Sequence, residues 1–338
     1  MTDNSKDRPS FRAAFAARKE SLFVTGQKND TNNAPRCGAA RKRTWLMTHF
    51  FQTLISGLSL GSIYALIALG YTMVYGIAKM LNFAHGDIIM VGAYAAIVAV
   101  FQMKLPGIVA VVVAVAVCTL LGVTVEFLAY KPLRKSPPLT VLITAIGVSY
   151  FLQNISLLIF GSEQMASPII MDLPAITVGG VQIDGITWGT LAVTSVIMIS
   201  LTLFINKTKM GKAMRAVSED KGAAELMGIS VNKTITTTFA IGSALAAIAS
   251  IFYGSAYVYI RPTTGAMPGI KAFTAAVFGG IGSIPGAMLG GILLGVIEQM
   301  SKMYISTLWS DAIVFGVLVL VLVVKPTGLL GKKISEKV

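Results

Sequence analysis

A short polar stretch between two apolar runs holds the residue types best suited to proton chemistry. It reads Asn82-Phe83-Ala84-His85-Gly86-Asp87. Imidazole and carboxylate groups are costly to bury at membrane depth and usually line a cavity or a proton path there. One interpretation is therefore a proton relay through His85 and Asp87. The other, which is preferred, is an interfacial turn in which Asp87 caps the helix that follows.

A second candidate site is a break inside an apolar run, Ile270–Gln299. The segment Gly-Gly-Ile-Gly-Ser-Ile-Pro-Gly (Gly279–Gly286) interrupts the run. Pro285 removes a backbone donor, and the glycines lower helix propensity, so two half-helices are expected. Broken helices in transporters present free backbone groups to polar substrates, whereas a re-entrant hairpin can also be purely architectural.

Two adjacent amides form a third candidate site. Gln153 and Asn154 lie in the middle of the apolar run Leu139–Phe160, where they must bind another helix or line a wet pathway. The residues that we select as candidates for lining a translocation pathway are Asn82, His85, Gln153, Asn154, Gly280, Gly282 and Ser283.

The polar segment Lys212–Lys233 carries an apolar stripe of its own. The stripe consists of Ala213, Met214, Val217, Ala224, Leu226 and Met227. Ser218, Glu219 and Asp220 suit a helix start, and Gly228 suits a helix end. A short amphipathic helix of this kind is typical of a docking element for a cytoplasmic partner, and a solvated connector is the alternative.

The sequence predicts no enzyme active site, metal site or cofactor. Its two cysteines, Cys37 and Cys118, have no metal-ligand spacing. The chain has no Gly-x-x-x-x-Gly-Lys-Ser/Thr phosphate loop, so ATP is expected to bind elsewhere.

The elements that position these residues are membrane helices. Hydrophobic residues make up 54% of the 338 residues and charged ones only 13%, about half the charge of a soluble domain. The net charge of +13 is then better explained by cytoplasmic loops than by nucleic-acid binding. We predict an all-α polytopic membrane protein with about eight or nine transmembrane helices and a broken or re-entrant segment near 279–286. The expected spans are Phe50–Tyr75, Ile88–Phe101 (short), Gly107–Leu128, Leu139–Phe160, Thr187–Ile205, Ile235–Tyr259, the broken run and Leu308–Val324.

The charge distribution predicts which side of the membrane each connecting segment faces. Basic residues gather around residues 130–138, in 206–234 and in the tail from Lys325, so these parts and the C-terminus should be cytoplasmic. Segment 161–186 holds Glu163, Asp172 and Asp184 without Lys or Arg, so it should face outward. The tail ends inside only if the broken run returns or crosses twice, which supports the break.

Residues 1–46 do not fit this arrangement. They carry ten Lys/Arg against four Asp/Glu, yet the alternation places the start of the first span outside. Their polar composition predicts a disordered leader. Either Met47 is the true start, so that the leader is not part of the working protein, or the basic tail is genuine and one crossing is miscounted.

Several longer motifs resemble one transporter family. Gly222–Gly228 is similar to the Glu-Ala-Ala-x-x-x-Gly coupling signature of ABC importer permeases, with Gly222 in place of the Glu and without the downstream Ile-x-Leu-Pro. The stretches Gly61–Gly76, Asn82–Gly86, Lys271–Met288 and Lys325–Gly328 resemble the LivH-type permease of branched-chain amino acid ABC importers. The resemblance covers the chain from about Met47 to its C-terminus.

This resemblance implies a location, a coupling loop and several partner subunits. It implies a type II-like permease domain at 47–338 in the bacterial inner membrane, with a coupling loop at about 206–234. It also implies a second related permease, two cytoplasmic ATPase subunits and a periplasmic amino-acid-binding protein. Coupling to the ATPase is carried over to Arg215, Glu219, Asp220, Ala223, Ala224 and Gly228.

Other functions stay open at this point. One is a proton-coupled secondary transporter of small polar solutes built on His85 and Asp87, and another is a passive channel. A third is an ABC permease for urea or short amides, since related permeases share these motifs and leave substrate recognition to the binding protein.

Overall fold

The computed structural model describes residues 38–134, 136–168, 170, 173–178 and 181–331. The chain divides into Met1–Met47 and Thr48–Val338, and the fold below is that of the second unit. Residues 1–37 of the expected leader, Lys135, Asp172 and the last lysines of the tail lie outside the described residues.

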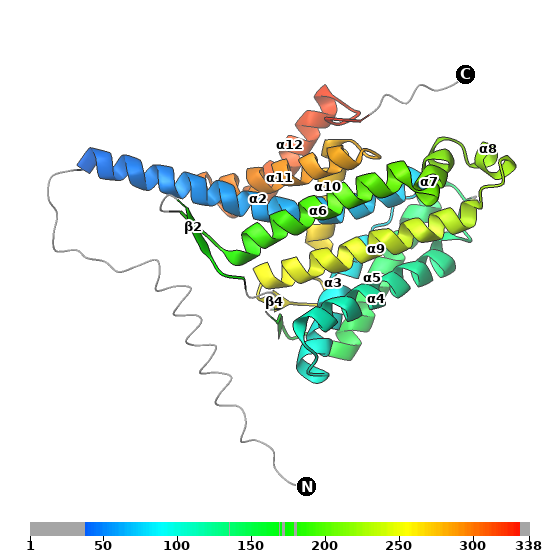
Figure 1. The fold of residues 1–338 in the computed structure, drawn as a ribbon, viewed down its shortest axis with the longest axis horizontal. Coiled ribbons are helices and arrows are strands. Elements are labelled where there is room, and N and C mark those ends of the chain that lie inside the picture. Colours follow the sequence, from blue (N-terminus) through cyan, green and yellow to red (C-terminus); the bar gives the residue numbers. More distant parts are fainter. Residues whose placement is uncertain (1–37, 135, 169, 171–172, 179–180, 332–338) are drawn as a thin grey trace, which may run out of the picture. The chain divides into compact units, whose positions relative to one another are not determined.

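Helices account for nearly all of the regular structure (Figure 1). They are α2 (Gly38–Ala78), α3 (His85–Ile97), α4 (Gly107–Val125), α5 (Pro138–Phe160), α6 (Gly185–Lys207), α7 (Lys209–Glu219), α8 (Lys221–Leu226), α9 (Val231–Ala256), α10 (Ala266–Gly279), α11 (Ile284–Tyr304) and α12 (Ser310–Val324). The π-helical turns Val98–Gln102 and Glu126–Tyr130 extend α3 and α4. Two short antiparallel pairs, β1 (Met165–Ala166) with β4 (Tyr259–Ile260) and β2 (Ile176–Val178) with β3 (Val181–Ile183), lie at the opposite end of the bundle from α8.

The helix count agrees with the predicted polytopic all-α fold. Within the described residues, seven helical segments are long and apolar enough to cross a membrane, and the shorter α12 is also apolar. Together with α10, of 14 residues, they make nine. The expected short span begins at His85 and reaches Gln102, so it is long enough to cross. At the other boundary, α2 begins at Gly38, inside the stretch expected to be disordered, because Ala, Arg, Lys and Leu extend a helix readily.

The predicted break lies between α10 and α11. Gly280 and Gly282 have φ angles of 105° and 92°, a left-handed conformation that favours glycine. Ser283 then begins α11, with its Oγ accepting a hydrogen bond from the N–H of Gly286 at 3.2 Å. The expectation of two half-helices is wrong for α11, whose 21 residues extend about 32 Å, because Pro285 occupies its first turn, where proline is tolerated.

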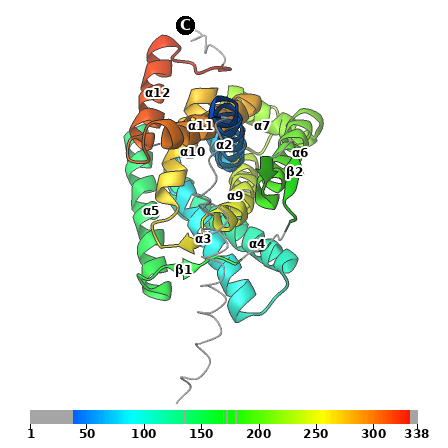
Figure 2. The same ribbon diagram turned by 90° about the vertical axis from the view of Figure 1, so that its left-hand side faces the viewer.

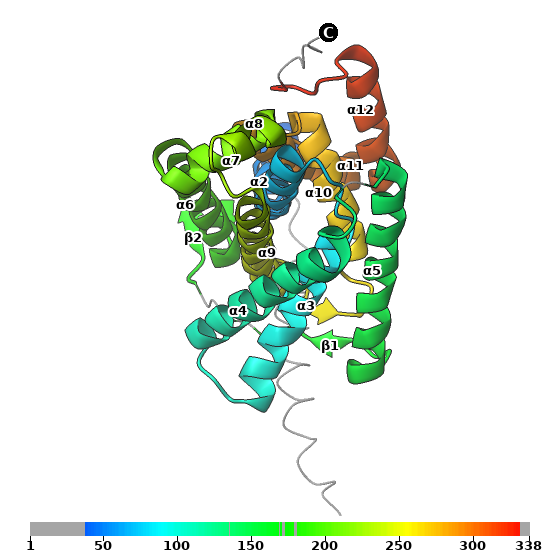
Figure 3. The same ribbon diagram turned by 90° about the vertical axis from the view of Figure 1, so that its right-hand side faces the viewer.

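Helices α2, α3 and α9 form the centre of the bundle, and α4, α5 and α6 form its rim. Inside the most apolar window of each central helix 67% of residues are buried, against 17–28% for the three rim helices. Figure 2 and Figure 3, which look along the bundle, place α2 between α10 and α11 on one side and α9 on the other.

Close contact of α2 with α11 depends on glycine, and Gly57 and Gly61, four residues apart, lie on one face of α2. A Cβ on Gly61 would lie 2.7 Å from Cα of Ile292, and one on Gly295 would lie 2.2 Å from the backbone N of Gly61. The two backbones therefore touch. Gly290 serves the α10 contact in the same way, since its Cβ would lie 2.1 Å from the carbonyl oxygen of Ala275.

We predict that Gly295→Ala destabilises the bundle. The added methyl group meets backbone atoms that cannot turn aside, and overpacking of this kind costs about 1–3 kcal/mol. Thermal unfolding of the purified chain in detergent should show a lower Tm. Gly316→Ala is the matched control on α12, where a Cβ meets nothing within 4 Å. An unchanged Tm for Gly295→Ala would contradict the contact.

Candidate functional site

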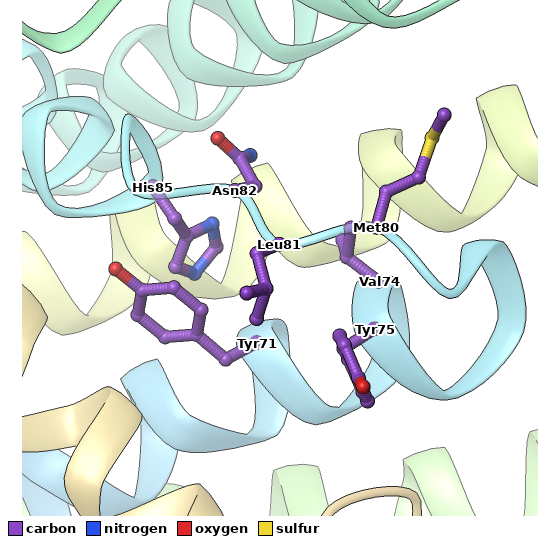
Figure 4. A pocket seen from close by; sticks show the side chains of 7 residues that line it. All are labelled: Tyr71, Val74, Tyr75, Met80, Leu81, Asn82 and His85. Atoms are coloured by element: carbon purple, nitrogen blue, oxygen red, sulfur yellow. The ribbon is translucent and has the colours of Figure 1, made fainter. Parts of the chain in front are cut away.

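A closed cavity lies where the chain passes from α2 to α3. It is lined by Tyr71, Val74, Tyr75, Met80, Leu81, Asn82 and His85 (Figure 4). The rings of Tyr71 and His85 lie edge to face with centroids 4.6 Å apart. The cavity has no room for a water molecule, and Asn82 Nδ2 and His85 Nε2 have no hydrogen-bond partner among the described residues. The lining therefore includes two buried polar side chains, Asn82 and His85, around a space too small for water in this conformation.

Asp87 does not cap the following helix, so that expectation is wrong. Helix α3 begins at His85, which places Asp87 in its first turn instead of at its N-cap, Ala84. The carboxylate turns to α5, where its Oδ1 accepts a hydrogen bond from Nε2 of Gln153 at 2.9 Å. Gln153 therefore binds another helix, one of the two roles expected for it.

Asn82 and Asn154 have different surroundings. Asn82 is buried, and its Oδ1 accepts a hydrogen bond from the hydroxyl of Tyr130 at 2.8 Å. Asn154 is exposed on α5, and its Nδ2 donates to the carbonyl of Tyr150 on its own helix at 2.7 Å. The structure therefore keeps Asn154 apart from the cavity that Asn82 and His85 share.

The end of α10 is occupied by the chain's own tail. Leu329 donates its N–H to the carbonyl of Phe278, and Leu330 donates to that of Gly279, both at 2.9 Å. A Cβ on Gly280 would lie 2.3 Å from the backbone N of Gly331. These carbonyls at the break are therefore bound to protein, although broken helices can leave such groups free.

A charge network centred on the buried Lys271 and Glu298 joins four helices, and the sequence analysis does not predict it. Nζ of Lys271 on α10 lies 2.9 Å from Oε1 of Glu298 on α11 and 2.7 Å from Oδ1 of Asp311 on α12. Lys302 donates to the same Glu298 oxygen at 2.6 Å, and the hydroxyl of Tyr64 on α2 donates to Oε2 at 2.9 Å. The four charges sum to zero, so the network is complete without a ligand. The sequence feature that points to this network is the pair Lys271 and Glu298, near the two ends of the apolar run Ile270–Gln299.

The segment after α6 folds into the two helices α7 and α8. Oδ1 of Asp220 accepts a hydrogen bond from the N–H of Ala223 at 3.0 Å and so caps α8. Gly228, with φ 79°, ends it, as expected. Met214 and Val217 of α7 and Ala224 of α8 are buried in the main core, so the pair is fixed to the bundle.

The residues expected to couple to an ATPase divide into two groups. Glu219, Asp220 and Ala223 are exposed, as is Arg215, whose guanidinium binds the carbonyl of Asn206 at 3.3 Å. Ala224 instead faces the core. Leu226 and Met227 belong to the expected apolar stripe but are 91% and 81% exposed, unlike its buried members. Because α8 is so short, its last turn projects beyond the bundle.

We predict that Glu298→Leu destabilises the chain by about 3 kcal/mol, because it removes the buried carboxylate that Lys271 and Lys302 share and leaves Asp311 to balance both ammonium groups. The double variant Lys271→Met/Glu298→Leu should lose less than the two single variants together. Unfolding by denaturant in mixed micelles measures both. Glu163→Gln, at an exposed carboxylate between α5 and α6, is the control. Additive losses would show that the two side chains do not interact.

Comparison with known proteins gives this arrangement a context. Residues 53–322 match the family model described as branched-chain amino acid transport system / permease component. The chain is 44% identical to the high-affinity branched-chain amino acid transport system permease protein BraD of Pseudomonas aeruginosa, over 86% of this chain and 98% of that protein. It is 43% identical to the permease protein LivH of Escherichia coli K12, with the same coverage.

Among solved structures, PsaBC from Streptococcus pneumoniae in complex with Fab aligns with 80% of this chain and 90% of that one. The TM-score is 0.41 and the identity 16%, so the likeness between the two folds is weak. The family match and the two permeases cover most of the chain, and the helices they cover are long and apolar enough to cross a membrane. The chain is therefore a multi-pass membrane protein that belongs to the family of branched-chain amino acid transport permeases.

Proposed function

We propose that this chain is the permease subunit of an ATP-driven importer of branched-chain amino acids, in the bacterial inner membrane. It forms the translocation pathway with a second related permease. Two cytoplasmic ATPase subunits bind the ATP, so the chain needs no cofactor, and a periplasmic binding protein delivers the substrate. The substrate class follows from the similarity to BraD and LivH, which are permeases of branched-chain amino acid transport systems.

The observation that carries the ATPase coupling is the exposed apolar pair Leu226 and Met227. Both side chains stand on a loop with Lys212, Arg215 and Lys233, whose charge is typical of the cytoplasmic side. Large apolar side chains held open to water mark a contact surface for another protein. Because α7 and α8 are anchored in the core, a push on this pair reaches the bundle.

Other features support the same orientation. Arg134 pairs with the buried Glu126 near this end, and Lys325 begins the tail on the same side as the α10–α11 turn that the tail binds. The outer loop holds Glu163 and Asp184. With the coupling loop inside, the C-terminus is cytoplasmic and the β-strands face outward.

The exposed face of α5 supports the pairing with a second permease. Asn154 and Tyr150 lie on that face, and a Cβ on Gly147 would meet nothing within 4 Å. An amide in the middle of a span is poorly accommodated by lipid alone. This face therefore suits a neighbouring protein and a wet pathway, with Asn154 as a lining residue.

Reconstitution tests the proposal directly. Proteoliposomes with both permeases and the ATPase, supplied with binding protein, should accumulate labelled leucine only when ATP is present on the ATPase side. The chain alone should transport nothing. Uptake by the chain alone would contradict the proposal, and uptake of urea or a short amide in place of leucine would correct its substrate.

We predict that Leu226→Asp/Met227→Asp prevents association with the ATPase, because two charges replace the apolar contact. Co-purification of tagged permease with the ATPase should fall at least tenfold, while the Tm of the permease stays unchanged. Leu308→Asp is the matched control, since Leu308 is equally exposed (91%) at the other end of the bundle. Retained association in the double variant would remove these residues from the contact.

A further inference from the structure

One lysine joins the coupling loop to the far end of α2. Lys221 is the first residue of α8, and its Nζ donates a hydrogen bond to the carbonyl oxygen of Ala78, the last residue of α2, at 2.8 Å. The last carbonyls of a helix lack partners within the helix and carry its negative dipole end, so an ammonium group is a favourable partner there. The contact bridges 143 residues of sequence.

The lysine is held there at some electrostatic cost. It is half-buried, and burial lowers its pKa, with repulsion from Arg134 and Lys79 adding to the effect. Its ammonium group donates a hydrogen bond to a backbone carbonyl instead of to a carboxylate. Lys221 is thus placed to hold the backbone at Ala78, where α2 ends.

The backbone that Lys221 holds leads straight into the closed cavity. Lys79 follows Ala78 with a φ of 58°, a left-handed conformation that a non-glycine residue keeps only when its neighbours impose it. Met80, Leu81 and Asn82 come next and line the cavity. A displacement of Ala78 must therefore move the cavity wall.

The opposite end of α8 carries the exposed pair Leu226 and Met227. The six residues of α8 extend about 9 Å, and Asp220 and Ala224 keep the helix in place. We infer that Lys221 is a positioning residue that transmits movement of the coupling loop to the α2–α3 connection and so opens or closes the cavity beside Tyr71 and His85. The inference rests on the proposed function.

Lys221→Met in the complete importer tests this role. The variant should co-purify with the ATPase as the wild type does and hydrolyse ATP within twofold of it. Leucine uptake measured on the same proteoliposomes should fall at least tenfold, so that more ATP is spent per leucine. Lys221→Arg, which keeps a cationic donor, should restore most of the uptake. Lys233→Met, at an exposed lysine of the same loop, should leave both rates unchanged.

Hydrogen exchange on the purified chain alone tests the link apart from transport. Amides of residues 79–84 should exchange faster in Lys221→Met, and those of α11 should not change. If the methionine variant does not fold, Lys221→Cys is compared before and after aminoethylation, which rebuilds a lysine-like side chain.

Unchanged exchange together with unchanged uptake would overturn the inference. Loss of ATPase binding in Lys221→Met would also overturn it, because Lys221 would then belong to the docking surface. A wild-type complex without ATP-dependent uptake would instead contradict the proposed function, and the exchange result would still decide whether Lys221 holds the connection.

Discussion

The need to pair every polar group inside the hydrocarbon governs this molecule, because lipid offers no hydrogen bonds. Glu298 is paired with Lys271, Lys302 and Tyr64, and these contacts join α10, α11 and α2. Asp87 is paired with Gln153, which joins α3 to α5. The polar residues that looked like candidates for chemistry are, for the most part, the bonds between helices.

Close backbone packing works together with these bonds. Between α2 and α11 the glycines Gly61 and Gly295 let the backbones touch, and Tyr64 reaches Glu298 one turn from Gly61 on α2. The hydrophobic effect contributes little to association between helices in lipid, so van der Waals contact and paired charges must determine which helices pack together.

Buried polar groups without partners and exposed apolar side chains are the exceptions to this pairing and packing, and they indicate where function lies. His85 and Asn82 keep polar atoms without partners among the described residues, beside a cavity that is shut. Leu226 and Met227 are apolar where the chain meets water. Lys221 and Lys79, which has a positive φ, lie between the two places, and under the proposed function they would link the ATPase contact to the α2–α3 connection.

The sequence by itself determined the membrane class, nearly all of the helices and a break within Gly279–Gly286, because apolar run length and helix-breaking residues act locally. Its longer motifs indicated the family. The tertiary structure decided what each polar residue binds. Asp87 meets Gln153 across 66 residues and Lys221 meets Ala78 across 143, and no local pattern specifies such pairs. It also decided which residues of one amphipathic stripe are buried, as Ala224 is, and which are exposed, as Leu226 is, because that depends on where α8 ends relative to the bundle.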